Sequence, residues 1–525
     1  MKTSAIFRTM TALVLALLTL TSGFPAYADN PPGPGFPPVP VPIPTQTDAR
    51  PVPAYIGDPA EPHPVSAPLI PQNPYMAAGS WSVVHNDAYM SDTYFTPGPL
   101  GKSPVVKSTL LASLADPTDP RPTLPGVMVF DRDGRLLAAV NKPEPHSAYM
   151  RAWLTLFDPD TLAALAWLPL PLEERPPQDG RIMKLPAGSY FYLDNEDRVV
   201  VGTAERSIWV VSHTHSAPFS LTVENKYPLG DDVIPPDDDF QAVQPDWSGR
   251  LWFASKGGVV GTFDLEGGKL LGTLKLPADE IIENAMAADE TGGVYLDSSD
   301  ALYRFDADPN GAPMITWREP YDGGTHVKVL SRGSGTTPTL MGTQYVAIVD
   351  NADPQDHVLV YRRAKGVNGP RLVCAEPIFM PGQSNSENSL IATDRSIVVE
   401  NNFGYRGIKS TLHGSTSKPG IARIDVEQNG CRTVWTNWEE SVASAATQKM
   451  SLTNGLIYTY TKSKGPVSTD AYYFTAVDFD TGRTVYKVLA GTGVLYNDHL
   501  SVVYVGPDEK VYVGVLGGIV TMRDK

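Results

Sequence analysis

Polar and charged side chains stand immediately before several short apolar stretches of this chain. The apolar stretches are typical of buried strands, so the polar residues mark the places where such strands begin. The side chains that could do chemistry there are Glu283, Asn284, Thr336, Thr337, Asn385, Glu387, Asn388, Lys449, Asn497, Asp498 and His499. Because they hold comparable places in different repeats, we expect them to converge on one mouth of a central channel.

The carboxylates and some of the amides in this set favour a hard divalent cation. Ca²⁺ and Mg²⁺ prefer oxygen ligands of the kind that Asp, Glu and Asn supply. The predicted metal ligands, with Ca²⁺ as the expected ion, are Glu283, Asn284, Glu387, Asn388 and Asp498.

The other members of the set suit catalysis or ligand binding. His499 and Lys449 are predicted to serve as a base or an electrophilic group. The predicted ligand-binding residues are Asn385, Asn497, Thr336 and Thr337. A purely structural role is the alternative, because Asn, Ser and Thr at strand starts commonly satisfy buried backbone groups.

Three further groups are weaker candidates. His213 and His215 alternate along a strand, which puts both rings on one face and suits a transition metal. Residues 350–353 have the composition of a cation-binding loop and equally of an Asx turn. Residues 400–402 follow an apolar strand and could line a channel mouth or cap a hairpin.

Two alternating types of hairpin must position these residues. The first is Thr475-Ala-Val-Asp-Phe-Asp-Thr-Gly-Arg-Thr-Val-Tyr-Lys487, in which two strands flank an Asp-Thr-Gly turn. The second is Val129-Phe-Asp-Arg-Asp-Gly-Arg-Leu-Leu137. Variants of both recur along the chain, and pairs of them return roughly every 40 to 60 residues, which is the spacing of propeller blades.

This spacing predicts an all-β fold: a single propeller of about eight four-stranded blades over residues 76–525. Seven blades are the close alternative, and a β-sandwich is the other all-β possibility. We expect an N-terminal strand to complete the last blade and close the ring. One blade is predicted over 323–370 and the next over 371–440.

The N-terminal region has two distinct compositions. Residues 1–28 are typical of a secretory signal, with Lys2 and Arg8 before an apolar run and a small-x-small site ending at Ala28. We therefore expect export, to the periplasm or the outside, after cleavage near Ala28. Residues 29–75 are dominated by proline and predict a polyproline-like or disordered spacer. No later stretch has the length and apolarity of a transmembrane segment.

The charge balance argues against two classes of partner. The formal charge is −16, and removal of the signal would leave 40 basic and 58 acidic residues. An acidic surface repels nucleic acid and anionic membranes. The expected partner is a small molecule, a saccharide, or another protein of the cell envelope.

The chain contains two cysteines, Cys374 and Cys431. Export favours a disulfide between them, and both lie on predicted strands of the same blade, 371–440. A bridge that closes this loop would contribute on the order of 4 kcal/mol in the chain-entropy model. Two unpaired buried thiols are the alternative.

The hairpin Ala476-Val-Asp-Phe-Asp-Thr-Gly-Arg-Thr-Val-Tyr486 resembles the repeat of the quinoprotein-like propellers, and Trp81-Ser-Val-Val-His-Asn-Asp87 resembles an opening found in many of them. Residues 333–342, 350–354 and 399–405 are similar to a group of exported bacterial propellers of unknown function. The resemblance implies a propeller, and it covers both pyrroloquinoline-quinone (PQQ) dehydrogenases and non-catalytic scaffolds. The dehydrogenases use adjacent cysteines beside the quinone, and this chain has no such pair, which argues against PQQ.

Three functions follow, in order of preference. The first is a small-molecule or saccharide site at one channel mouth, with metal-assisted hydrolysis or lyase chemistry as one form of it. The alternative is a non-catalytic interaction scaffold of the cell envelope, and a quinone-dependent dehydrogenase comes third. A site should gather titratable groups from several blades, whereas a scaffold should have an exposed docking patch and a plugged channel.

Overall fold

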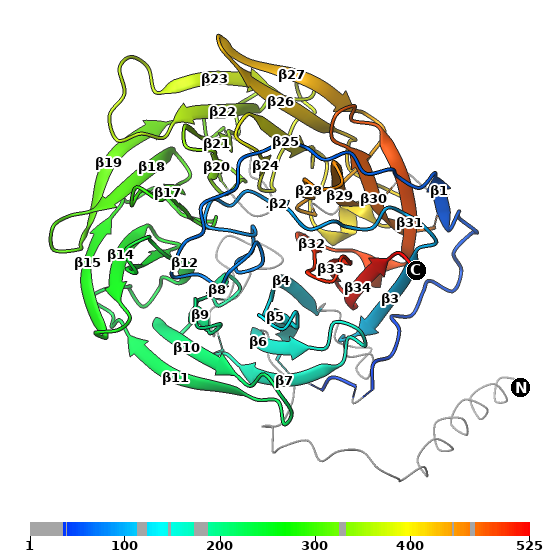
Figure 1. Ribbon diagram of the computed structural model, residues 1–525, viewed down its shortest axis with the longest axis horizontal. Helices are drawn as coiled ribbons and strands as arrows, with labels where there is room; N and C mark the ends of the chain where they lie inside the picture. Colours follow the sequence, from blue (N-terminus) through cyan, green and yellow to red (C-terminus); the bar gives the residue numbers. More distant parts are fainter. Residues whose placement is uncertain are drawn as a thin grey trace, which may run out of the picture.

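The computed structural model describes residues 35–37, 39–112, 123–144, 149–172, 187–324, 332–443, 446–462 and 468–525. The predicted signal peptide lies outside these residues. The described strands form eight sheets arranged in a ring, so the fold is an eight-bladed β-propeller, as predicted (Figure 1). Seven blades and a sandwich are both ruled out by this strand order.

The first four blades are formed by consecutive strands, with the innermost strand first in each. Blade 1 contains β4 (Leu124–Phe130), β5 (Leu136–Pro143), β6 (Met150–Phe157) and β7 (Ala164–Pro169). Blade 2 contains β8 (Phe191–Leu193), β9 (Val199–Gly202), β10 (Ser207–His213) and β11 (Leu221–Pro228). Blade 3 contains β12 (Phe240–Pro245), β13 (Leu251–Ser255), β14 (Val259–Asp264) and β15 (Lys269–Lys275). Blade 4 contains β16 (Ala287–Ala288), β17 (Val294–Asp297), β18 (Ala301–Ala307) and β19 (Pro313–Pro320).

The remaining blades follow the same plan with additions from the N-terminal region. Blade 5 contains β20 (Thr339–Met341), β21 (Tyr345–Val349), β22 (His357–Arg362) and β23 (Leu372–Pro377). Blade 6 contains β24 (Ile391–Ala392), β25 (Ser396–Glu400), β26 (Ile421–Glu427) and β27 (Gly430–Asn437). Blade 7 contains β28 (Lys449–Ser451), β29 (Leu456–Thr461), β30 (Ala471–Asp478) and β31 (Thr484–Thr492), flanked by β1 (Tyr55–Gly57) and β2 (Thr93–Tyr94). Blade 8 contains β32 (Val503–Val505), β33 (Val511–Val515), β34 (Gly518–Arg523) and β3 (Val105–Leu110).

Blade 8 closes the ring. Its three inner strands come from the C-terminus, and its outermost strand β3 pairs antiparallel with β34. The two ends of the propeller therefore share one sheet, as the sequence predicted. Closure of this kind removes the open edges that an unclosed row of sheets would leave between its first and last members.

The two hairpin types have separate places in a blade. The Asp-x-x-Gly type joins the first strand to the second, and Oδ1 of Asp131 accepts the backbone N–H groups of Asp133 at 3.0 Å and Arg135 at 2.7 Å. The Asp-x-x-Thr-Gly type joins the third strand to the fourth, and Oδ1 of Asp478 accepts the N–H of Thr481 at 2.8 Å. Both aspartates stabilise a turn through bonds to residues close in the sequence, which explains why the repeat can be recognised from the sequence.

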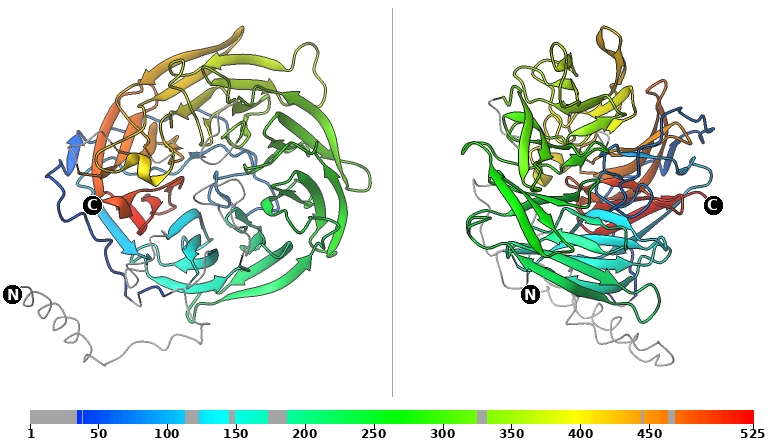
Figure 2. Two further views of the ribbon diagram at one scale, coloured as in Figure 1. Left: turned by 180° about the vertical axis from the view of Figure 1, so that it is seen from behind. Right: turned by 60° about the vertical axis from the view of Figure 1, so that its left-hand side comes forward.

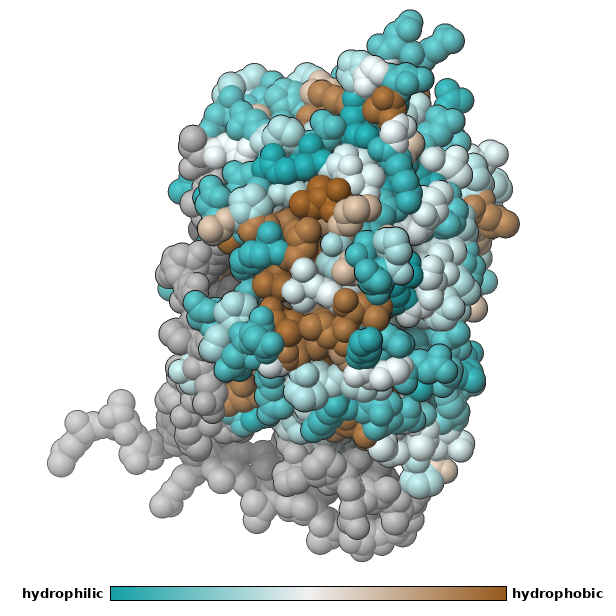
Figure 3. All heavy atoms as spheres, turned by 90° about the vertical axis from the view of Figure 1, so that its left-hand side faces the viewer, coloured by the Kyte–Doolittle hydropathy of each residue, from teal (hydrophilic) through white to brown (hydrophobic). Residues whose placement is uncertain are grey.

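The core lies between neighbouring sheets. Second strands such as β13 are buried at every position, because each sheet has a blade packed on both faces. Outer strands such as β15 alternate between half-buried and exposed residues. One side of the ring wall carries β15 and β19, and Figure 3 shows an apolar area on that side, where β19 exposes Met314 and Ile315.

The described part of the proline-rich region lies along the ring and departs from the expected disordered spacer. β1 adds a strand to the outer edge of blade 7 by pairing antiparallel with β31. Ile43 is 2% exposed, and its backbone N–H donates to Ser108 Oγ at 3.0 Å. Proline lacks the backbone donor that a sheet needs, so the pairing falls on the proline-free stretch of this region.

Cys374 and Cys431 form a disulfide, as predicted, but the two residues belong to different blades. Cys374 lies on β23 of blade 5 and Cys431 on β27 of blade 6, so the predicted boundary at residue 370 was wrong. The error arose because β23 follows a turn that resembles the start of a new repeat. The bridge links the outer edges of adjacent blades, and its presence fits an exported protein. Among the described residues, no helix is long and apolar enough to cross a membrane.

Candidate functional site

The innermost strands of the ring surround residues 73–94, which we call the central segment. Figure 1 shows the N-terminal part of the chain, in blue, crossing the front of the ring, and in the view from behind in Figure 2 it lies at the back. The segment meets the innermost strands near their ends, which places it at one mouth of the channel. β2, at its C-terminal end, pairs in parallel with β28, with Thr93 opposite Met450.

The central segment bonds to all eight blades. Backbone N–H groups of Phe130, Leu193, Ala288, Leu340, Ala392 and Met450 donate to its carbonyls, and its Trp81 and Asn73 side chains donate to the carbonyls of Val505 and Pro245. These eight bonds are 2.8–3.2 Å long and reach blades 1, 2, 4, 5, 6, 7, 8 and 3 respectively. Since buried backbone groups must be paired, this segment completes the ring's interior and is part of the folded unit.

A buried network anchors the segment at the centre of the channel. The Lys449 ammonium donates to the Asp92 carboxylate and, at 2.9 Å, to the Val84 carbonyl. His85 Nδ1 lies 3.1 Å from the same carboxylate. Burial lowers the pKa of His85 despite the opposing charge of Asp92, so the ring is neutral and Nδ1–H donates to Asp92. Burial also lowers the pKa of Lys449.

The other nitrogen of His85 faces the start of two innermost strands. Nε2 lies 3.0 Å from Ser389 Oγ and 3.3 Å from Thr337 Oγ1. With Nδ1 protonated, Nε2 accepts from these hydroxyls. The order hydroxyl, imidazole, carboxylate is the one that activates a serine nucleophile. Here it also joins blades 5 and 6 to the central segment, and Ser389 is 4% exposed.

The predicted residues of blade 6 form a cluster with a second carboxylate, Glu400. Glu400 Oε1 accepts hydrogen bonds from the Asn388 amide and, at 3.2 Å, from Asn402 Nδ2. Asn385 Nδ2 donates to Glu387 Oε1 at 3.0 Å, and the Glu387 N–H donates to Asn402 Oδ1 at 2.9 Å. The five side chains lie at the start of β24 and the end of β25, and all are buried.

Two polar atoms of this cluster have no hydrogen-bond partner within the described chain. They are Oε2 of Glu400 and Oδ1 of Asn385. Burial raises the pKa of Glu400 to about 8, the two Asn bonds oppose that rise, and the charges of Asp498 and Asp92 add to it. Glu400 is therefore mostly protonated at neutral pH and can donate from Oε2.

The predicted residues of blade 8 meet a long loop of blade 6, residues 401–420, which contains η3 (Ile408–Thr411). The Tyr405 hydroxyl of this loop bonds to His499 Nδ1. Asn497 Nδ2 donates to Thr411 Oγ1 at 3.1 Å and to the Tyr472 hydroxyl at 3.1 Å. Burial lowers the pKa of His499 to about 4, so its imidazole is neutral at physiological pH.

The predicted residues of blades 4 and 5 form a third contact group. Asn284 Nδ2 donates to Asp297 Oδ2 at 2.8 Å, and Thr337 Oγ1 accepts the N–H of Ala285 at 3.3 Å. Thr336 Oγ1 accepts the N–H of Val349 at 2.9 Å, which is a structural use of that hydroxyl. Glu283 is half-buried, and its carboxylate accepts the Arg332 N–H at 3.0 Å.

Among the predicted residues, Thr337 and Lys449 therefore contact His85 and Asp92 directly. Those of blade 6 gather around Glu400, and those of blade 8 meet the blade 6 loop. Sequence reasoning missed His85, Asp92, Ser389 and Tyr405 as members. His85 and Asp92 belong to no repeat and lie about 250 to 360 positions from their partners in the ring. The available signal was that His85 lies in Trp81–Asp87, the stretch that resembles an opening found in many quinoprotein-like propellers.

Metal binding by the predicted carboxylates stays a prediction. Within the part of the chain that the structure describes, Glu283, Glu387 and Asp498 belong to no group of three or more His, Cys or acidic residues with converging ligand atoms. Such a group does exist at Asp131, Asp197, His213 and His215, between blades 1 and 2. None of its members belongs to the channel cluster.

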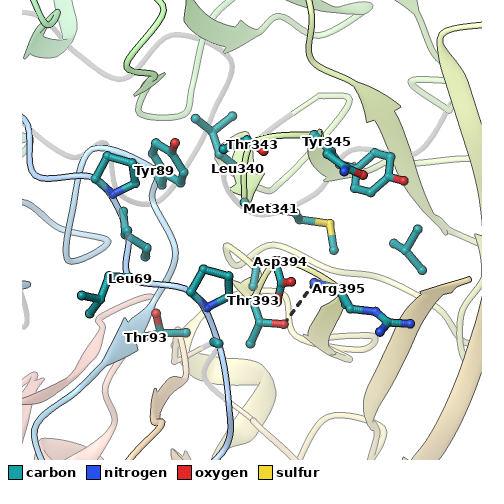
Figure 4. Close-up of a pocket in the computed structure, with 18 of the residues that line it drawn as sticks. Leu69, Tyr89, Thr93, Leu340, Met341, Thr343, Tyr345, Thr393, Asp394 and Arg395 are labelled. Carbon is teal, nitrogen blue, oxygen red and sulfur yellow. Dashed lines mark hydrogen bonds between the residues drawn. The ribbon is translucent and has the colours of Figure 1, made fainter.

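A separate pocket of about 610 Å³ lies on the face of the central segment (Figure 4). Residues 67–71 form one wall, and the inner hairpins of blades 5 and 6 form the other. Leu69, Leu340 and Met341 give it an apolar lining, with Asp394 and Arg395 at one side. None of the lining residues was among the predicted site residues, and residues 67–71 belong to the region that was expected to be a spacer.

No protein-family model matches the chain. An uncharacterized protein of Archaeoglobus fulgidus is 29% identical over 269 residues, which is 46% of this chain and 51% of that protein. The match therefore spans about half the length of that relative.

Solved structures with a similar fold include a streptogramin B lyase, with 10% identity, a TM-score of 0.39, and coverage of 80% of this chain and 97% of that one. BamB from Moraxella catarrhalis has 12% identity, a TM-score of 0.34, and coverage of 63% and 93%. At these levels of identity and superposition, the likenesses say nothing about activity.

Proposed function

We propose that the protein binds a small polyhydroxylated ligand of the saccharide type at the channel mouth opposite the central segment. The observation that carries the proposal is the cluster of Asn385, Glu387, Asn388 and Glu400, which contains buried polar atoms without protein partners in the described chain. Such atoms cost free energy unless a ligand or water satisfies them. Hydroxyl groups, which donate and accept, would pair with both Asn385 Oδ1 and protonated Glu400.

Position along the innermost strands supports the same choice of mouth. The central segment bonds to residues at or near the ends of these strands, whereas Asn385, Asn388 and His499 precede the starts of theirs. Predicted contacts from neighbouring blades are Thr337 and Asn497. The ligand class is polar and neutral, because the surrounding carboxylates would repel an anion.

Acid–base chemistry at this mouth is the finer proposal. Glu400, mostly protonated at neutral pH, would act as the acid, and neutral His499, oriented by Tyr405, would act as the base. This pairing suits a hydrolase or a lyase. Lys449 would act on the site only indirectly, because its ammonium is fully buried and forms an ion pair with the Asp92 carboxylate. A Ca²⁺ ion at Glu387, Asn388 and Asp498 belongs to the same proposal.

The test is a thermal-shift screen of neutral mono- and disaccharides, followed by calorimetry on the purified protein. Asn385→Ala and Glu387→Gln should each weaken binding about tenfold, the equivalent of one good hydrogen bond. The exposed residues Asn368 and Glu439 supply matched controls, as Asn368→Ala and Glu439→Gln, which should bind as the wild type does. Equal binding by all four variants, or no binding by the wild type, would refute the proposal.

A second candidate is a non-catalytic scaffold of the cell envelope. Two observations favour it: the central segment closes the channel, and the ring wall exposes Met314 and Ile315. Apolar patches on a wall suit a protein partner. Met314→Lys would abolish capture of that partner and leave saccharide binding unchanged. Both functions presume export, which N-terminal sequencing of the mature protein would test by a start near residue 29.

A further inference from the structure

The turns of blades 1 and 2 bring two aspartates and two histidines together. Asp131 follows β4, Asp197 lies in the turn between β8 and β9, His213 ends β10, and His215 follows it. One ligand atom from each lies within 4.8 Å of the corresponding atoms of the other three. Asp131, Asp197 and His213 are buried, and His215 is exposed.

The separations between these atoms fit a tetrahedral metal ion. Four ligands about 2.0–2.1 Å from zinc lie about 3.3–3.4 Å from one another. His213 Nε2 lies 3.2 Å from Asp131 Oδ2 and 3.7 Å from Asp197 Oδ2. His215 Nε2 lies 3.8 Å from Asp197 Oδ2. Contraction by a few tenths of an ångström would bring the two longer separations to the tetrahedral value.

Hydrogen bonds from neighbouring groups fix the orientation of two of these side chains, as is common for the ligands of a metal ion. His215 Nδ1 lies 2.7 Å from Asp133 Oδ2, which leaves Nε2 to face Asp197. Asp131 Oδ1 is held by two backbone N–H groups, so Oδ2 is the oxygen that faces His213. Histidine ligands in metal sites commonly donate their second nitrogen to a carboxylate in this way.

A second, independent observation points to an absent ligand. Asp197 is 4% exposed, yet its Oδ1 atom has no hydrogen-bond partner in the described part of the chain. Arg132 lies 3.2 Å from the Asp197 carboxylate and Arg135 lies 3.2 Å from the Asp131 carboxylate, and Asp133 beside Arg135 adds a third negative charge against these two positive ones. A divalent ion beside Asp197 would offset the negative charge that is left and would give its Oδ1 atom a partner.

We propose that Asp131, Asp197, His213 and His215 bind a transition-metal ion of the zinc class, which ties blade 1 to blade 2. Two imidazoles and two carboxylates are a donor set that zinc accepts and that calcium, which takes oxygen ligands, does not favour. Four protein ligands leave no open position, so the ion has a structural role. The site shares no residue with the proposed saccharide site.

The experiment loads the purified protein with Zn²⁺, removes excess metal by buffer exchange, and measures bound zinc by elemental analysis. Co²⁺ substitution gives a second readout, because tetrahedral Co²⁺ absorbs strongly in the visible range. We expect one zinc per chain, a tetrahedral Co²⁺ spectrum, and a higher melting temperature with metal than after chelation.

His215→Ala is the decisive variant, because its side chain is 37% exposed and its loss should leave the fold intact. It should lower zinc affinity at least tenfold and remove the Co²⁺ spectrum. His357→Ala, which breaks a histidine–aspartate pair in blade 5, is the matched control and should keep one zinc. Absence of retained zinc in the wild type, or equal retention by a folded His215→Ala variant, would overturn the proposal.

Discussion

The ammonium of Lys449 and the carboxylate of Asp92 form an ion pair inside the ring, and neither side chain is exposed to solvent. Lys449 belongs to blade 7, and Asp92 belongs to the central segment, which enters the same sheet through β2. Removal of either partner would leave the other charge buried and unpaired. The ion pair therefore holds the central segment, which closes one mouth of the channel, to the folded ring.

Lys449→Met should lower the free energy of unfolding by about 3–5 kcal/mol, because it leaves the Asp92 carboxylate buried beside a neutral imidazole. Denaturant titration followed by tryptophan fluorescence measures the loss. Lys102→Met breaks an exposed pair with Glu61 and should cost less than about 1 kcal/mol. If both variants lost the same small amount, the anchoring role of the pair would be refuted.

Glu400→Gln should change how stability depends on pH. Burial raises the pKa of Glu400 from 4.5 to about 8, so the folded state holds this proton more tightly than the unfolded state. The contribution is full below pH 4.5 and is lost as pH rises through 8. Glutamine mimics the protonated form at every pH.

The variant should therefore gain stability over the wild type by about 1.4 kcal/mol per pH unit across this window, and the two should be similar near pH 4.5. Urea titrations at several pH values measure the difference. Glu439→Gln, at an exposed position, should show no such trend. A constant difference between Glu400→Gln and wild type would contradict the assignment of a protonated Glu400.

Gly335→Ala should disturb the cluster without changing any polar side chain. A Cβ at Gly335 would lie 2.5 Å from the Ser386 carbonyl oxygen and 2.6 Å from the Glu387 Cα, so blade 5 would push the start of blade 6 outward. We expect a loss of about 1–3 kcal/mol in unfolding free energy and weaker saccharide binding. Gly366→Ala, which meets nothing within 4 Å, is the control, and equal behaviour of the two would argue against close packing here.

Reduction of the disulfide should destabilise the ring at the junction of blades 5 and 6. Cys374 and Cys431 are 57 positions apart, and a loop of this size predicts a loss on the order of 4 kcal/mol. Thermal unfolding with and without reductant measures it. The Cys374→Ser, Cys431→Ser double variant should match the reduced protein and lose its response to reductant. An unchanged melting temperature in both tests would contradict a stabilising role.

The parts of the fold that depend on local chemistry could be predicted from the sequence. Asp131 and Asp478 accept hydrogen bonds from backbone amides two to four positions away, so the turns of each blade can be recognised from its own sequence. The common position of the candidate site residues, at the starts of innermost strands, follows from the same repeat. Cys374 was assigned to the wrong blade because the turn before β23 was taken for the start of a new repeat, although the half-buried and exposed residues of β23 are those of an outer strand.

The parts that depend on single distant contacts could not be predicted. The central segment is not periodic, and its partners lie in eight different blades. Asp131 is 82 positions from His213, so the histidine pair seemed to lack other ligands. The prolines around Tyr55–Gly57 led to the prediction of a spacer, yet these three residues are enough to form a strand that pairs with blade 7.

A crystal structure of the protein with the best saccharide from the screen tests the central proposal most directly. We expect the ligand at the channel mouth, with its hydroxyls within hydrogen-bond distance of Asn385 Oδ1 and Glu400 Oε2. Density for the ligand in the pocket between residues 67–71 and blades 5 and 6, with the channel cluster unchanged, would contradict it.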